Sequence, residues 1–68
     1  MERTMILDHL ALAKQHVALG EKHITRQREI IADLELGGHD TTEAELLLRQ
    51  FEELQVQHTS HRDRLEVN

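Results

Sequence analysis

A pair of adjacent glycines, Gly37-Gly38, interrupts a sequence that otherwise favours helix along its whole length. The chain contains no proline, and leucine and glutamate, both good helix formers, are its commonest residues. Glycine readily adopts the left-handed conformation that ends a helix, and Asp40 or Thr42 can begin a capping box for the next one. We therefore expect an all-α fold with one domain spanning 1–68: an antiparallel two-helix hairpin with helices at about 4–36 and 41–66 and a turn at 37–40.

Apolar and small residues recur in alternating steps of three and four within each expected helix, which is the spacing of a heptad seam. In the first helix the seam consists of Leu10, Ala13, Val17, Gly20, Ile24, Gln27, Ile31 and Leu34. In the second it consists of Ala44, Leu47, Phe51, Leu54, His58, His61 and Leu65. Folding the chain at the glycines places Gly20 opposite His58, so this glycine is expected to make room for an imidazole.

The chain is too short to bury a sizeable core of its own. It has 68 residues, of which 38% are hydrophobic and only one is aromatic. A chain of this size buries only about 60% of its unfolded surface, and residues outside the seam leave a second apolar stripe that needs further neighbours. We expect the hairpin to dimerise into a four-helix bundle. The expected oligomer interface comprises Leu12, His16, Leu19, His23 and Ile30.

Six histidines are a large number for a chain of this length. His9, His16 and His23 recur every seven residues, and His58 and His61 lie three apart on the expected seam. If His16, His58 and His61 converge, they form a candidate site for zinc, copper or nickel. Two other interpretations remain open: buried histidines that fix register and oligomeric state, and a pH-sensing role. We expect no cofactor.

Charge and motifs narrow the classes of function. The net charge is −5, and basic residues are mixed with acidic ones throughout, so we expect no nucleic-acid partner. No apolar run is long enough to cross a membrane. Residues 1–13 contain several charged side chains, so we do not expect them to be a signal peptide. We therefore expect a cytoplasmic protein. No catalytic arrangement surrounds the single serine, Ser60, so we do not expect an enzyme.

The composition and patterning favour a small oligomerising helical module that binds itself and a protein partner in an adaptor or regulatory role. The alternative is a histidine-based metal-binding or metal-sensing protein. A third hypothesis is a phosphorelay partner that presents a surface histidine.

Several short segments have a familiar pattern: Gly20-Glu21-x-His23-Ile24-x-x-Gln27, Gly38-His39-Asp40-Thr41, Phe51-Glu52 and His61-Arg62-Asp63-Arg64-Leu65. Over about residues 9–65 they resemble a group of short bacterial helical proteins of unassigned function. The resemblance implies a bacterial, cytoplasmic setting. It supplies no activity, cofactor, partner or site residue.

Overall fold

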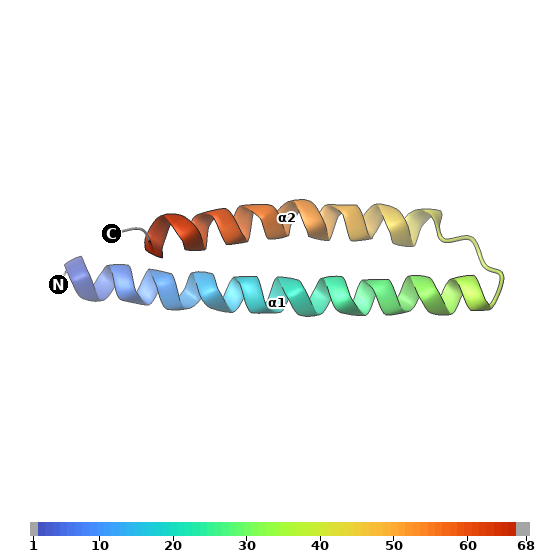
Figure 1. Cartoon of the computed structure of the whole chain (residues 1–68), viewed down its shortest axis with the longest axis horizontal. Coiled ribbons are helices and arrows are strands. Elements are labelled where there is room, and N and C mark those ends of the chain that lie inside the picture. The colour runs from blue at the N-terminus through green and yellow to red at the C-terminus, as the bar shows by residue number, and fades with distance from the viewer. Residues whose placement is uncertain (1, 67–68) are drawn as a thin grey trace.

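A computed structural model shows two antiparallel helices joined by one turn (Figure 1). Helix α1 spans Glu2–Leu36 and helix α2 spans Thr42–Glu66. The structure describes the backbone of residues 2–66 and the side chains of residue 5 and residues 7–66. The hairpin measures 55 × 14 × 13 Å, so it is one long, thin pair of helices. The expected all-α hairpin is confirmed, and its boundaries lie within two residues of those predicted.

The glycine pair ends α1 as expected. Gly38 has a φ angle of 71°, in the left-handed region that glycine tolerates best. Its N–H donates to the carbonyl of Glu35 at 3.0 Å, and the N–H of His39 donates to the carbonyl of Leu34 at 2.9 Å. These two bonds form a Schellman motif, which satisfies carbonyls left free at the end of the helix.

Asp40 caps the start of α2. Its Oδ1 accepts hydrogen bonds from the backbone N–H of Thr42 at 2.9 Å and from the Thr42 hydroxyl at 2.6 Å. These two donors hold the pKa of the Asp40 carboxyl below its ordinary value, because they stabilise the ionised form. Glu43 and Glu45 follow in the first turn, where negative charge interacts favourably with the helix dipole.

The predicted seam of α1 is confirmed. Its buried side chains are Ala13, Val17, Gln27 and Ile31, each at most 9% exposed. The other four predicted seam positions are half-buried. Helix α2 has no fully buried residue among those described. The contact between the helices is therefore a narrow strip in which a few buried residues of α1 meet half-buried residues of α2.

The predicted seam of α2 is wrong at alternate positions. Leu47, Leu54 and His61 are exposed, and the half-buried side chains lie one residue later, at Leu48, Gln55 and Arg62. The remaining predicted positions, Ala44, Phe51, His58 and Leu65, are half-buried as expected. The sequence left the choice open because three consecutive leucines, at 46–48, allow either of two neighbouring stripes to face α1.

Two glutamines connect the helices and define this arrangement. Gln27 of α1, only 6% exposed, donates through Nε2 to the carbonyl of Ala44 at 2.9 Å. Gln55 of α2 donates through Nε2 to the carbonyl of Val17, also at 2.9 Å. The Gln55 amide lies against Gly20, where a Cβ atom would overlap Gln55 Oε1 and approach its Cδ to 2.7 Å.

Gly20 therefore does make room for a side chain, but for Gln55 and not for His58. The partner of Gly20 is three residues earlier in α2 than expected, so the predicted register is wrong by almost one helical turn. The physical reason is hydrogen bonding. The amide of Gln55 can donate to the carbonyl of Val17 because nearby Gly20 has no side chain in the way. The heptad pattern indicates only which positions are apolar, so it does not predict such a bond.

A double-mutant cycle should reveal the contact between Gly20 and Gln55. Gly20→Ala alone should change the free energy of unfolding by less than about 0.5 kcal/mol, because a helix-propensity gain of about 1 kcal/mol offsets the loss of one hydrogen bond. In a Gln55→Ala background the same change should stabilise by about 1 kcal/mol. Urea unfolding at one fixed protein concentration measures both. An equal effect in the two backgrounds would contradict the contact.

The Asp40 cap should give a pH-dependent contribution to stability. Because the folded pKa of Asp40 is lowered, its contribution should be present above about pH 4 and be lost as the pH falls below that. Asp40→Ala should therefore lower the melting temperature at pH 7, and the difference from the parent should shrink at pH 3. Asp40→Asn, which keeps an acceptor oxygen but cannot ionise, is the control and should show less pH dependence. A difference for Asp40→Ala that is the same at both pH values would rule out the ionised cap.

Candidate interaction surface

The seam divides the surface of the hairpin into two long sides, and one of them is charged. Lys14 Nζ lies 3.7 Å from Glu66 Oε1, and an Arg28 guanidinium nitrogen lies 3.3 Å from Glu52 Oε2. Both ion pairs cross from α1 to α2 on the same side of the seam. We call this side the ion-pair face. Its partners are well exposed, so each pair contributes at most about 1 kcal/mol.

The opposite side carries leucine and histidine. On α1 these residues follow the seam at the same alternating steps of four and three, and on α2 they recur every seven residues. We call this side the histidine–leucine face. It comprises Leu12, His16, Leu19, His23 and Ile30 of α1 and Leu47, Leu54 and His61 of α2.

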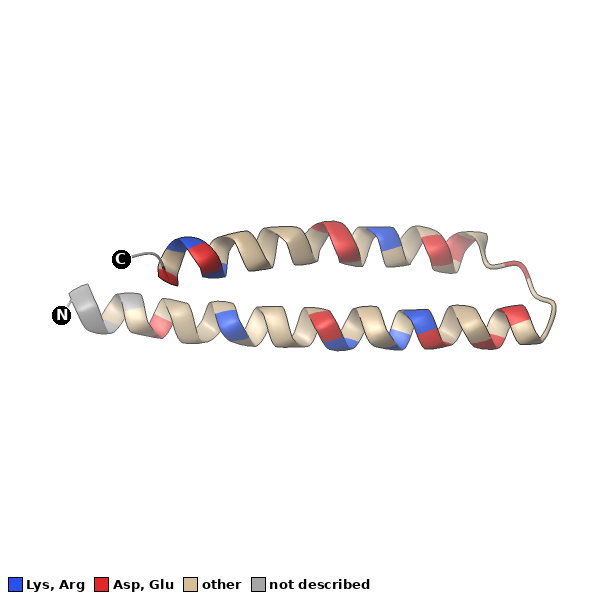
Figure 2. Ribbon diagram, viewed as in Figure 1, with Lys and Arg blue, Asp and Glu red and all other residues tan. Residues whose placement is uncertain are grey.

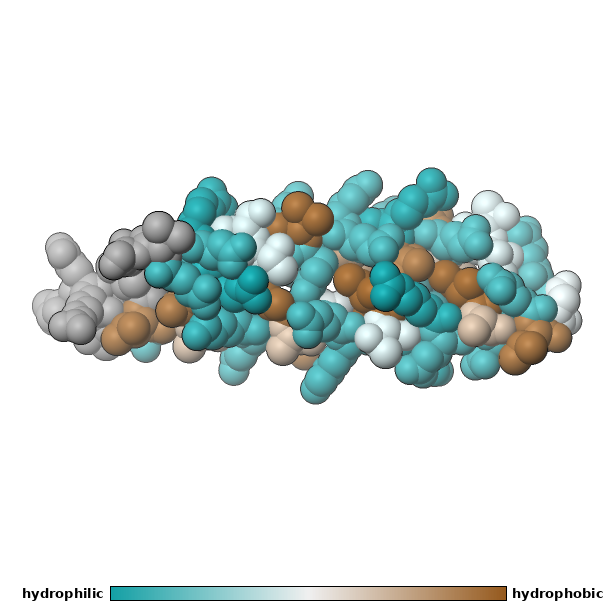
Figure 3. All heavy atoms as spheres, viewed as in Figure 1, coloured by the Kyte–Doolittle hydropathy of each residue, from teal (hydrophilic) through white to brown (hydrophobic). Residues whose placement is uncertain are grey.

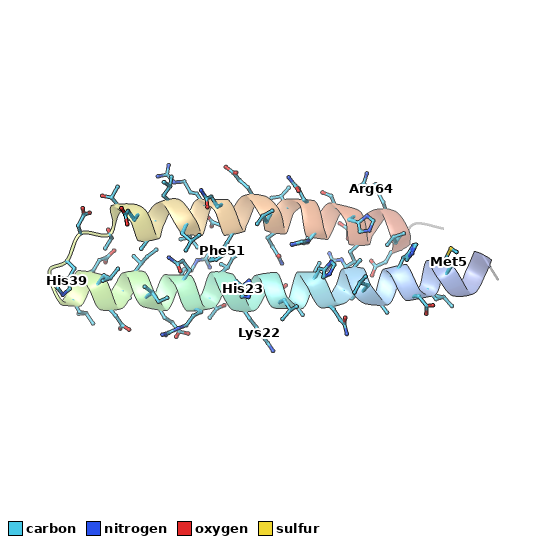
Figure 4. All side chains as sticks on the ribbon, turned by 180° about the vertical axis from the view of Figure 1, so that it is seen from behind. Met5, Lys22, His23, His39, Phe51 and Arg64 are labelled. Carbon is cyan, nitrogen blue, oxygen red and sulfur yellow. The ribbon has the colours of Figure 1, made fainter. Side chains whose placement is uncertain are left out.

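Two aromatic contacts place the histidines of α1 beside α2. The rings of His16 and His58 have centroids 5.6 Å apart, and those of His23 and Phe51 are also 5.6 Å apart. Figure 4 shows Phe51 between the helices and His23 over the α1 ribbon, while Lys22, the residue next to His23, points away from α2. His16 and His23 therefore form an edge of the seam while remaining exposed.

The leucines of this face are open to solvent. Leu12, Leu19 and Leu54 are each about half exposed, at 50%, 51% and 49%, and Leu47 is 40% exposed. Ile30 is half-buried. All five residues of the expected oligomer interface thus lie on one side of α1. The structure adds Leu47 and Leu54 from α2, which the sequence analysis had placed inside the seam.

Fixed charges are scarce on the histidine–leucine face. Within residues 5–66, helical periodicity places only four of them there: Arg26, Asp33, Glu43 and Arg64. The first three lie toward the turn, and Arg64 lies near the end of α2. Along the middle of the face, leucine alternates with histidine. Figure 2 shows acidic and basic residues interspersed along both helices, with no basic stripe.

The predicted metal ligands are only partly brought together. His16 and His58 are adjacent across the seam, but His61 is exposed on the neighbouring stripe of α2. Within the described part of the chain, no group of three or more histidine and carboxylate side chains has a geometry that could hold a metal ion. One hairpin thus brings together two of the three predicted metal ligands, the imidazoles of His16 and His58.

The ion-pair face has a shallow groove between the helices, lined by Ile24, Gln55 and Val56 together with the Arg28–Glu52 pair and Thr59. It is open to solvent. Figure 3 shows apolar atoms of the seam between the helices, surrounded by polar side chains. A second depression, near Lys22 and Arg26, is formed by α1 alone. Neither one gathers an acid, a base and a nucleophile around an enclosed space.

Comparison with known protein families, curated proteins and solved structures finds no match for this chain. Neither described helix combines the length and the apolar character that crossing a lipid bilayer requires.

Proposed function

We propose that this chain is a small, non-enzymatic helical interaction module that acts as a homo-oligomer and, in that form, as an adaptor or regulatory partner of another protein. We place it in the cytoplasm, as the composition and charge of the sequence lead us to expect. The observation that supports the proposal most strongly is the imbalance between buried and exposed apolar side chains.

That imbalance is large. Three hydrophobic side chains are buried among the described residues, whereas nine large ones are between 40% and 88% exposed. Isolated helical hairpins of this size rarely bury enough apolar surface to offset the entropy cost of folding. Association would bury part of the exposed set, and the histidine–leucine face holds four of its leucines.

A histidine-based metal-binding role is the second candidate, and it is supported by the pairing of His16 with His58. Two imidazoles that bind one zinc ion through bonds of about 2.0–2.1 Å have ring centres roughly 5–6 Å apart. The observed separation of 5.6 Å falls in that range. Because structural zinc takes four ligands, a second chain would have to complete the set.

The oligomer proposal predicts that the chain is not a monomer at micromolar concentration. Sedimentation equilibrium at neutral pH should give a mass of at least twice 7.9 kDa. The helical circular dichroism signal should fall together with the mass on dilution, since folding and association are coupled in such chains. A mass of 7.9 kDa with full helicity would refute this proposal.

The metal proposal predicts saturable zinc binding that needs both imidazoles. Titration calorimetry on protein purified without a histidine tag should give about one zinc ion per two chains, and His16→Gln or His58→Gln should weaken binding by about tenfold or more. His39→Gln, in the turn, is the matched control and should leave binding unchanged. Equal losses in all three variants would show that zinc binds nonspecifically.

A further inference from the structure

Two stripes of α2 have the spacing needed to face α1, and they have every second position in common. The common positions, which we call the shared column, are half-buried and comprise Ala44, Phe51, His58 and Leu65. The observed stripe adds Leu48, Gln55 and Arg62, and the other adds the exposed Leu47, Leu54 and His61. At about 100° per residue, a rotation of α2 by about 50° around its own axis exchanges one stripe for the other.

Apolar burial favours the stripe that the structure leaves outside. That stripe adds two leucines to the shared column, whereas the observed stripe adds one leucine, Leu48, with the polar Gln55 and Arg62. Gln55 also carries a cost, because its Oε1 is buried and has no hydrogen-bond partner among the described residues. The observed arrangement of α2 therefore needs a specific contact that offsets both disadvantages.

That contact is the fit of Gln55 against Gly20. The Nε2 atom of Gln55 donates to the Val17 carbonyl at 2.9 Å. A Cβ atom on residue 20 would overlap Gln55 Oε1, so the amide takes this position because residue 20 is glycine. The two ion pairs that join the helices are well exposed, and they hold α2 in place only weakly.

Other contacts between the helices involve the shared column and are compatible with either stripe. Gln27 Nε2 donates to the backbone carbonyl of Ala44 at 2.9 Å. The ring of His58 has its centroid 5.6 Å from that of His16. Since Ala44 and His58 face α1 in both arrangements, these contacts do not choose between the two stripes. The choice depends on Gln55 and Gly20.

We propose that α2 has two packings on α1, related by this rotation, and that the Gly20–Gln55 contact selects the observed one. The observed packing displays Leu47 and Leu54 on the surface. In the rotated packing these leucines enter the seam, and the surface loses apolar area that association would use. This consequence rests on the proposed oligomeric function. It makes Gln55 a positioning residue for the interaction surface, and a partner that binds the displayed leucines stabilises the observed packing.

Cysteine reporters test the rotation, because the chain has no cysteine of its own. Leu48→Cys reports a position that is half-buried now and exposed after rotation, whereas Ala44→Cys reports a position of the shared column. Gly20→Ala fills the space that the Gln55 amide occupies. It should speed alkylation at position 48 about fivefold or more and change that at position 44 by less than about twofold. Equal rates at position 48 with and without Gly20→Ala would overturn the inference.

A second background distinguishes rotation of α2 from a simple displacement of the Gln55 amide. Leu47→Gln combined with Leu54→Gln removes the apolar side chains that the rotated packing would bury. In that background Gly20→Ala should no longer speed alkylation at position 48, and circular dichroism checks that the helices are retained. An effect of Gly20→Ala that persists there would show that the amide moves without rotation and would overturn the second packing.

Sedimentation equilibrium tests the consequence for assembly. Gly20→Ala should raise the dimer dissociation constant about tenfold or more. Thr25→Ala, an exposed site on α1 where alanine also raises helix propensity, is the control and should change it by less than about threefold. Faster alkylation at position 48 with an unchanged dissociation constant would overturn the link to assembly. A monomeric parent would overturn the proposed function, while the alkylation rates would still decide the rotation.

Discussion

The narrow contact between α1 and α2 limits what this hairpin can be. The buried side chains in the described chain are Ala13, Val17, Gln27 and Ile31, and all of them belong to α1. So few buried side chains cover little apolar area, and area is what stabilises a small domain. Seven leucines of the described chain are at least 40% exposed, so the surface carries much of the hydrophobic character that a larger protein would place in its core.

Within this narrow contact, two amides supply the specificity that apolar packing lacks. Leucine side chains tolerate small shifts along a seam, whereas a hydrogen bond of 2.9 Å from Gln27 or Gln55 to a backbone carbonyl does not. The Gln55 amide fits against α1 only at Gly20, where it occupies the space that a side chain would fill. Buried polar groups that fix register in this way usually reduce stability.

The two sides of the hairpin then acquire different properties. Two ion pairs join the helices on one side, while on the other side the helices meet through the ring contacts of His16 with His58 and of His23 with Phe51. The adjacent imidazoles of His16 and His58 also underlie the metal-binding alternative.

The sequence by itself determined the two helices, their ends and the seam of α1. These features depend on local chemistry: helix propensity, the left-handed Gly38, the Asp40 cap and a heptad repeat without competitors. It also placed Leu12, His16, Leu19, His23 and Ile30 on one stripe. Only the tertiary structure decided which stripe of α2 faces α1, because residues 46–48 fit two stripes equally well by apolar character. In the observed arrangement of α2, Gln27 and Gln55 form hydrogen bonds across the seam. Leu47 and Leu54 then lie on the surface beside the histidines.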